Sequence, residues 1–177
     1  MKVCSMSRRA AKRRGSFRHV TLYVFCRRPH PIGISIEDRF FFSWEYVDKA
    51  SHPAYMWMNS QLSRLTRLDL DRPPVWAWKR FSSRRVEREA VGALWGGNEK
   101  YFTRIAIRVP RCFVLQSSYS AWCEMLFDSI SNEICFDAHP ARGLLFSTAA
   151  GRHGRYVQAV IPYLAKDWIT SIKKYQL

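Results

Sequence analysis

The strongest constraint on the fold comes from a stretch near the middle of the chain, Phe102–Val109, in which apolar and polar side chains alternate. A period of two is typical of a β-strand with one buried face. The side chains expected to point into a core are those of Ile105, Ile107 and Val109. Arg104 and Arg108 are expected to point the other way. A strand of this kind needs partners, so the chain must build a sheet.

Further segments have the β-branched and aromatic composition of strands and are bounded by Pro, Gly or polar residues. The predicted strands are 20–25, 75–81, 112–115, 156–161 and 168–175. The short apolar run 40–44 fits neither a strand nor a helix clearly. Trp76 and Trp78 share one face of their strand, where packing against a helix is expected rather than a stacking platform for bases.

Two segments have apolar side chains at three- and four-residue spacing, which indicates helices over about 53–70 and 118–131. Pro53 suits the first turn of a helix, and Ser51 is a candidate cap. The buried face expected for the first helix comprises Ala54, Trp57, Met58, Leu62, Leu65 and Leu68. For the second helix it comprises Tyr119, Trp122, Cys123, Leu126 and Ile130.

Strands and helices follow one another without a regular βαβ order, which favours an α+β fold with a mixed or mostly antiparallel sheet. The length of 177 residues suits one domain. Residues 1–16 have almost no apolar periodicity and are predicted to be a flexible basic arm. Residues 17–177 are predicted to be the α+β domain.

Charge is the main functional signal. The chain has 29 Lys and Arg against 14 Asp and Glu, a net charge of +15, and no acidic residue precedes Glu37. Such a bias favours a polyanionic partner, above all nucleic acid, with a solvated tail as the alternative. The basic residues predicted to bind phosphates are Arg8, Arg9, Lys12, Arg13, Arg14, Arg18, Arg27, Arg28, Arg84, Arg85 and Arg88.

The sequence contains no pattern that identifies a reaction, cofactor or metal. The five cysteines are widely spaced, and reduced buried thiols fit them better than a site at Cys112, Cys123, Cys135 and His139. An odd, unpatterned set suits a reducing compartment, which is the basis for expecting the cytoplasm. No apolar run is long enough for a membrane span. Oligomeric state and catalysis stay open.

Three groups of residues, taken in order, resemble an uncharacterised family of small bacterial and phage proteins with a domain of unknown function. They are Ala54–Met58 with Gln61 and Pro74–Trp78; Val114–Ser117 with Tyr119–Trp122 and Phe127–Asp128; and Val157–Ala159 with Asp167–Ile169 and Lys174–Tyr175. The resemblance covers about residues 50–177, and the Trp-Ala-Trp element is its most specific part. It implies the fold and extent of the domain but no activity. It does not cover the basic arm.

The end of the chain is also similar to the final hairpin of ADP-ribosyltransferase-type folds. In those folds a Glu on the penultimate strand contacts the nicotinamide ribose, whereas this chain has Gln158 at the nearest position. An amide cannot supply the carboxylate that stabilises an oxocarbenium-like transition state. This analogy predicts a pocket lined by Tyr23 and Gln158.

Three functions follow as hypotheses. The first is a non-catalytic binding protein that contacts nucleic acid or a nucleoprotein assembly through its basic residues, as a phage or mobile-element accessory factor. The second is an ADP-ribosyltransferase-like enzyme, degenerate if Gln158 replaces the carboxylate. The third is an inhibitor whose basic surface docks on an acidic protein.

Overall fold

The computed structural model describes residues 18–26, 39–80, 87–88, 101–132, 134–147 and 157–176. Its main sheet has six strands in the order β5–β6–β3–β1–β4–β8, and all neighbouring pairs are antiparallel. The strands are β1 (His19–Cys26), β3 (Val75–Arg80), β4 (Tyr101–Pro110), β5 (Leu115–Ser118), β6 (Val157–Ile161) and β8 (Ile169–Gln176). A second sheet pairs β2 (Arg39–Phe40) with β7 (Leu164–Ala165).

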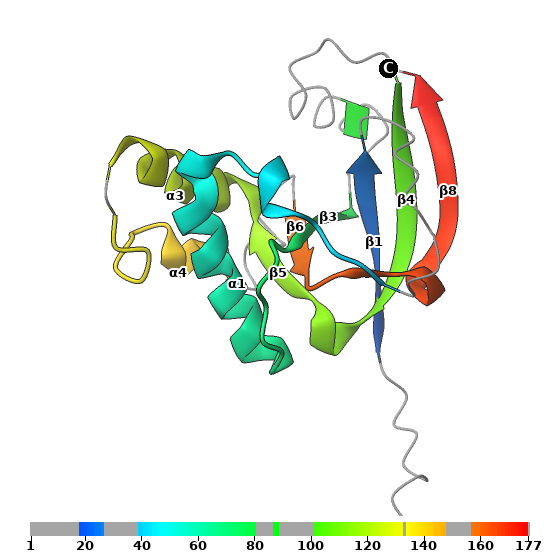
Figure 1. Ribbon diagram of the computed structural model, residues 1–177, viewed down its shortest axis with the longest axis horizontal. Coiled ribbons are helices and arrows are strands. Elements are labelled where there is room, and N and C mark those ends of the chain that lie inside the picture. The colour runs from blue at the N-terminus through cyan, green and yellow to red at the C-terminus, as the bar shows by residue number, and fades with distance from the viewer. Residues whose placement is uncertain are drawn as a thin grey trace, which may run out of the picture.

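The helices lie to one side of the molecule. α1 (His52–Thr66), α3 (Tyr119–Ser131) and α4 (Arg142–Leu145) gather beside the β5–β6–β3 half of the sheet, whereas β1, β4 and β8 form the half farther from them (Figure 1). The predicted α+β class with two main helices and an antiparallel sheet is therefore confirmed.

The pairing of β1 with β4 explains the alternating segment. Leu22 lies opposite Ile107 and Val24 lies opposite Ile105, and all four side chains are buried. Opposite residues of an antiparallel pair project to the same face, and their neighbours project to the other. Arg108 is accordingly exposed on the opposite face, as expected.

The face of the sheet under the helices carries one hydrophobic core, called here the helix-side core. Its buried members are Ala54, Met58, Leu62, Ala121, Trp122, Met125, Ala141, Leu145 and Val160. Trp76 packs against it with its ring 4.9 Å from that of Trp122, and the ring of Trp78 lies 5.0 Å from that of Tyr119. The two tryptophans of β3 are thus packed against α3, which confirms the packing predicted for them.

The opposite face carries the aromatic-side core, which no long helix of the described residues covers. Its buried members are Leu22, Val24, Val75, Ala77, Ile105, Ile107, Val109, Val114, Ala159, Ile161, Tyr163, Leu164, Ala165 and Trp168. Phe40, Phe42 and Phe113 pack against it, together with Leu68. Short segments with large rings therefore seal this face.

α1 departs from expectation at both ends. It begins at His52 after a 3₁₀ turn over Lys49–Ser51, and Ser51 makes no side-chain capping bond. It ends at Thr66 rather than near residue 70, because Arg67 adopts a left-handed conformation with φ 59°. This turn carries Leu68 to the aromatic-side core and leaves Leu65 45% exposed, so the prediction that Leu65 is buried was wrong.

α3 packs with a face that only partly matches the prediction: Trp122 is buried and Leu126 packs against the helix-side core, as expected. Its buried residues are Ala121, Trp122 and Met125, whereas Ile130 is 44% exposed. The reason is the junction with β5: Ser118 is buried at the end of that strand and accepts a hydrogen bond from the Ala121 amide. Residues three, four and seven positions after such a cap lie on the same helix face.

The strand predicted at 112–115 was placed three residues too early in the sequence. After β4 the chain makes a 3₁₀ turn over Arg111–Phe113, and β5 starts only at Leu115. The Arg111 amide donates to the carbonyl of Arg18 at 2.8 Å, which holds this turn across the beginning of β1. The undecided run 40–44 forms the end of β2 and the first residue of a 3₁₀ turn over Trp44–Tyr46.

Candidate nucleic-acid interface

Only part of the predicted phosphate-binding set can be placed. Arg18 and Arg88 are described and both are exposed. The remaining members of the set, Arg8, Arg9, Lys12, Arg13, Arg14, Arg27, Arg28, Arg84 and Arg85, lie outside the described residues, as does the whole arm 1–16. Arg18 directly precedes β1, so the place where the arm joins the fold is known.

That junction lies at the end of the sheet where β1 begins and β4 stops. His19 pairs with Pro110, and the next residue, Arg111, donates its amide to the carbonyl of Arg18. The Arg111 guanidinium donates through Nη1 to the carbonyl of Val114 at 3.2 Å, and the residue is exposed. Two arginines are therefore fixed side by side in the backbone at this end.

A hollow of about 760 Å³ opens at the same end of the sheet. We call it the basic hollow. It is lined by Arg39, Pro110, Phe113, Tyr163, Ala165, Lys166, Asp167 and Trp168. Two of its charged lining residues are basic and one is acidic, and the backbones of Arg111 and Arg18 lie next to Pro110 of the lining. The local field favours an anion.

Stacked rings form the wall of the basic hollow. The rings of Tyr163 and Trp168 are 5.1 Å apart and nearly parallel, at 21°. The Arg39 guanidinium lies 4.7 Å above the Tyr163 ring, a cation–π contact that holds its planar donor group at the rim. On the same ring, Phe41 packs at 5.5 Å and remains 43% exposed.

Exposure decides which of these rings can meet a ligand. Tyr163 and Trp168 are each only 7% exposed, so they support the hollow from beneath. Arg39, in the lining, is exposed, and Phe41 is an exposed ring that contacts Tyr163 without lining the hollow itself. A guanidinium forms paired hydrogen bonds with phosphate oxygens, and an aromatic face stacks on a base without regard to sequence. The arrangement therefore suits a negatively charged polymer that carries flat, stacking rings.

A second basic surface lies on β1, β4 and β8, on the same face of the sheet as Trp76 and Trp78. The Arg104 guanidinium sits 4.9 Å over the Tyr23 ring and forms an ion pair with Glu87 at 2.8 Å. Arg108 on β4 and Lys173 on β8 are exposed on the same face. Glu87 neutralises one of the positive charges of this surface, that of Arg104.

Tyr23 and Gln158 lie on one face of the sheet, on β1 and β6. Trp78 lies between them, paired with Tyr23 on β1 and with Gln158 on β6. Gln158 is only 4% exposed, beside the buried Ser117 of β5. The pocket that the ADP-ribosyltransferase analogy predicts stays a prediction.

Four of the five cysteines lie among the described residues. Cys26, Cys112, Cys123 and Cys135 are free thiols. Burial raises the pKa of Cys26 and also that of Cys123, where a hydrogen bond with Tyr119 partly opposes the effect. A raised pKa keeps a thiol protonated and unreactive.

The described residues also hold no group of three or more His, Cys, Asp or Glu side chains placed to bind a metal. His139 instead contacts Asp128, with Nε2 2.9 Å from Oδ2.

No family model matches the chain, and searches of curated proteins and of solved structures find no match either. The resemblance to small bacterial and phage proteins therefore stays a prediction. Among the helices of the described residues, none combines the length and apolar character that a membrane crossing requires.

Sequence reasoning missed Arg39, Lys166 and the rings beneath them. Arg39 directly precedes the aromatic run whose state was undecided, and Lys166 lies two positions before Trp168. The only signal in the sequence was the repeated placement of a basic residue near large aromatics. Their convergence depends on the pairing of β2 with β7, Arg39 opposite Ala165, which composition does not reveal.

Proposed function

We propose that this protein binds nucleic acid through the basic hollow and the basic residues that lead into it from the N-terminus. The supporting observation is the hydrogen bond between the Arg111 amide and the Arg18 carbonyl. This bond lies next to Pro110 in the lining of the hollow that contains Arg39 and Lys166, and in the sequence Arg18 closely follows residues 1–16, which include five of the predicted phosphate-binding residues. A single polyanion can therefore contact both.

The mode of binding follows from the chemistry of these groups. Lys and Arg neutralise phosphates and release counterions, so affinity depends on salt and carries little sequence information. Phe41 adds an exposed ring for stacking, which favours a single strand over a duplex whose bases are already stacked.

The test measures the affinity of the full chain for a labelled single-stranded oligonucleotide, and for its duplex, over a range of salt concentrations. The variant Arg39→Ala/Lys166→Ala should weaken binding and lower the slope of log affinity against log salt by about 0.7 for each phosphate of the single strand that the variant no longer neutralises. Neutralising Arg8, Arg9, Lys12, Arg13 and Arg14 together to Gln should flatten the slope further.

The matched control removes two exposed lysines away from the basic hollow, Lys49→Ala/Lys174→Ala, and should leave the slope unchanged. Absence of binding at low salt, or equal effects of the two double variants, would overturn the proposal. A partner that stays bound in pull-down after nuclease treatment would point to an acidic protein instead.

A further inference from the structure

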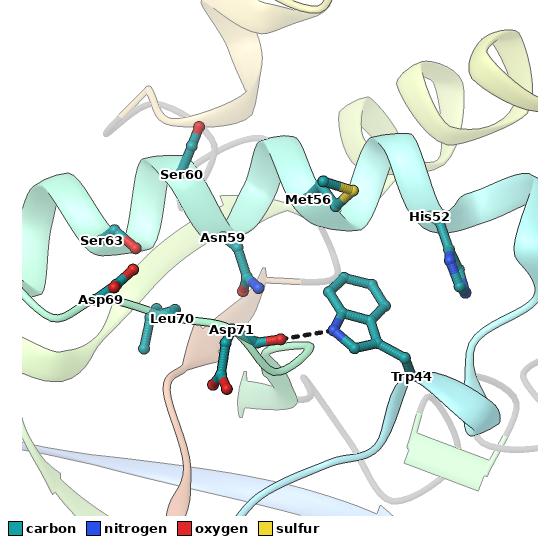
Figure 2. Close-up of a pocket in the computed structure, with 9 residues that line it drawn as sticks. All are labelled: Trp44, His52, Met56, Asn59, Ser60, Ser63, Asp69, Leu70 and Asp71. Carbon is teal, nitrogen blue, oxygen red and sulfur yellow. Dashed lines mark hydrogen bonds between the residues drawn. The ribbon is translucent and has the colours of Figure 1, made fainter.

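A second hollow, of about 600 Å³, lies along α1 on the side of the 3₁₀ turn Trp44–Tyr46 and the segment 69–71 (Figure 2). It is lined by Trp44, His52, Met56, Asn59, Ser60, Ser63, Asp69, Leu70 and Asp71. None of these residues belongs to the basic hollow, so the two sites are separate.

The lining of this hollow is acidic, whereas the chain as a whole is strongly basic. In a protein with a net charge of +15, its lining contains two aspartates and neither Lys nor Arg. Both aspartates are exposed, and Asp71 has a distant ion pair with its neighbour Arg72, at 3.9 Å between two largely exposed side chains. Such a pair is weak, so the carboxylate stays accessible to a cation. We call this site the acidic hollow.

Asn59 gives an independent sign of a missing partner. The residue is only 5% exposed, and its Nδ2 donates to the carbonyl of Arg72 at 2.7 Å. Its Oδ1 is buried and accepts no hydrogen bond from the residues that the structure describes. Buried acceptors are almost always satisfied, so this one points to a donor that a ligand brings. In Figure 2 the Asn59 side chain extends from α1 toward segment 69–71, across from the ring of Trp44.

Trp44 supplies a fixed flat wall. Its Nε1 donates to the carbonyl of Asp71 at 2.7 Å, and the His52 ring packs 5.0 Å away. His52 in turn has Nε2 3.1 Å from the carbonyl of Val47. Because the indole N–H is already used, the ring face is what Trp44 can offer, and a tryptophan face is the best aromatic partner for a cation.

We propose that the acidic hollow binds a guanidinium group. A guanidinium is planar, stays charged and carries five N–H donors with no acceptor. It can stack on the Trp44 ring and donate to Asn59 Oδ1, while the carboxylates of Asp69, beside Ser63, and of Asp71, directed away from α1, make the surroundings negative (Figure 2). An ammonium group has the charge but lacks the flat face. The source is either a small guanidinium compound or an arginine side chain of a peptide.

The test follows the indole N–H signal of Trp44 in the full-length ¹⁵N-labelled protein, assigned by its loss in Trp44→Phe. The probe is N-acetyl-arginine amide, and the matched control is N-acetyl-citrulline amide, which has the same shape without the charge. We expect a saturable shift with the arginine probe and none with the citrulline probe. Asp69→Asn/Asp71→Asn should weaken the arginine probe at least tenfold.

Two further measurements complete the design. Glu124→Gln removes an exposed acid that lines neither hollow and should leave binding of the probe unchanged. Acetyl-Gly-Arg-Gly amide that binds at least tenfold more tightly than the arginine probe identifies a peptide side chain as the source, and equal binding identifies a small molecule. No saturable shift, an equal response to citrulline, or equal affinity in Asp69→Asn/Asp71→Asn would overturn the proposal.

Discussion

The two faces of the main sheet bury their apolar side chains in different ways. The helix-side core is closed by α1 and α3, whose periodic faces supply long buried stretches. The aromatic-side core is closed by short turns that place Tyr163, Trp168 and Phe113 against the strands. Large rings compensate for the missing helix because each buries far more area than an aliphatic side chain.

The surfaces beside the two cores differ as well. The basic hollow borders the aromatic-side core, since Phe113, Tyr163 and Trp168 belong to both. The acidic hollow lies along α1, which closes the helix-side core. The proposed anion site and the proposed cation site thus lie on separate parts of the fold, one at the end of the sheet and one along a helix.

The largest effect on stability is expected for Trp122→Ala in the helix-side core. Trp122 is 3% exposed and its ring lies 4.9 Å from Trp76 and 6.0 Å from Tyr55. Removing it should lower the free energy of unfolding by about 3–5 kcal/mol. Urea denaturation followed by circular dichroism measures the change. Phe127→Ala on the same helix is the control: that side chain is 65% exposed, and its removal should cost at most about 0.5 kcal/mol.

Trp168→Ala tests the other core and should cost about 3 kcal/mol, the low end of the range for buried tryptophans, because one edge of the ring borders the basic hollow. Both cores share the same strands, so each variant should shift one common unfolding transition. Two separate transitions, seen as a difference between tryptophan fluorescence and circular dichroism, would show that the aromatic-side core is an independent unit. Tyr46→Ala, at a 67% exposed position, is the control.

The strands of this fold were largely predictable from sequence, and the reason is their clear period. Phe102–Val109 and the pair Trp76 and Trp78 have the expected faces, because a side chain on a strand has only two directions. Helix faces were less predictable. Leu65 and Ile130 continue the apolar pattern in sequence, but both are exposed, since the left-handed Arg67 ends one helix early and the Ser118 cap sets the phase of the other.

The candidate sites were less predictable than the fold. Of the phosphate-binding residues predicted from sequence, Arg18 alone lies beside the basic hollow among those described. Arg39 and Lys166 meet there through the pairing of β2 with β7, two strands of two residues each. Strands this short have no period to detect. The acidic hollow was equally hidden, because it joins residues of one helix to segments that precede and follow it.

A smaller effect is expected for Ser118→Ala at the junction of β5 and α3. The Ser118 hydroxyl accepts from the Ala121 amide at 3.5 Å, a long bond, and lies 3.1 Å from the Ser120 hydroxyl. Removing the cap should cost about 0.5–1 kcal/mol, near the lower end for N-cap substitutions. Chemical denaturation measures it. Ser129→Ala, which removes a hydroxyl within the same helix, should change stability less, and a larger effect there would argue that Ser118 does not cap the helix.

The smallest expected effect is a difference in how the free energy of unfolding depends on pH, measured with a cysteine near each core. Burial raises the pKa of Cys26, which packs against the aromatic-side core, above its ordinary value of 9.0. In the folded state the thiol then holds its proton at a pH where the unfolded chain has released it. Its contribution to stability is therefore complete below the ordinary pKa and is lost as pH rises toward the folded value.

Unfolding free energies measured between pH 7.5 and about 9.5 should fall more steeply for the natural chain than for Cys26→Ala. The measurements stop at that pH because the buried Tyr55, whose pKa burial also raises, has not yet begun to ionise there. Cys112→Ala is the matched control, because Cys112 is exposed and its thiol is hydrated in both states. Cys123→Ala makes the same comparison for α3. The hydrogen bond of Cys123 with Tyr119 opposes the effect of burial on its pKa, so the difference in slope from the natural chain should be smaller than for Cys26→Ala. Equal slopes for Cys26→Ala and Cys112→Ala would mean that water reaches Cys26, and that the rings of the aromatic-side core do not seal its face of the sheet.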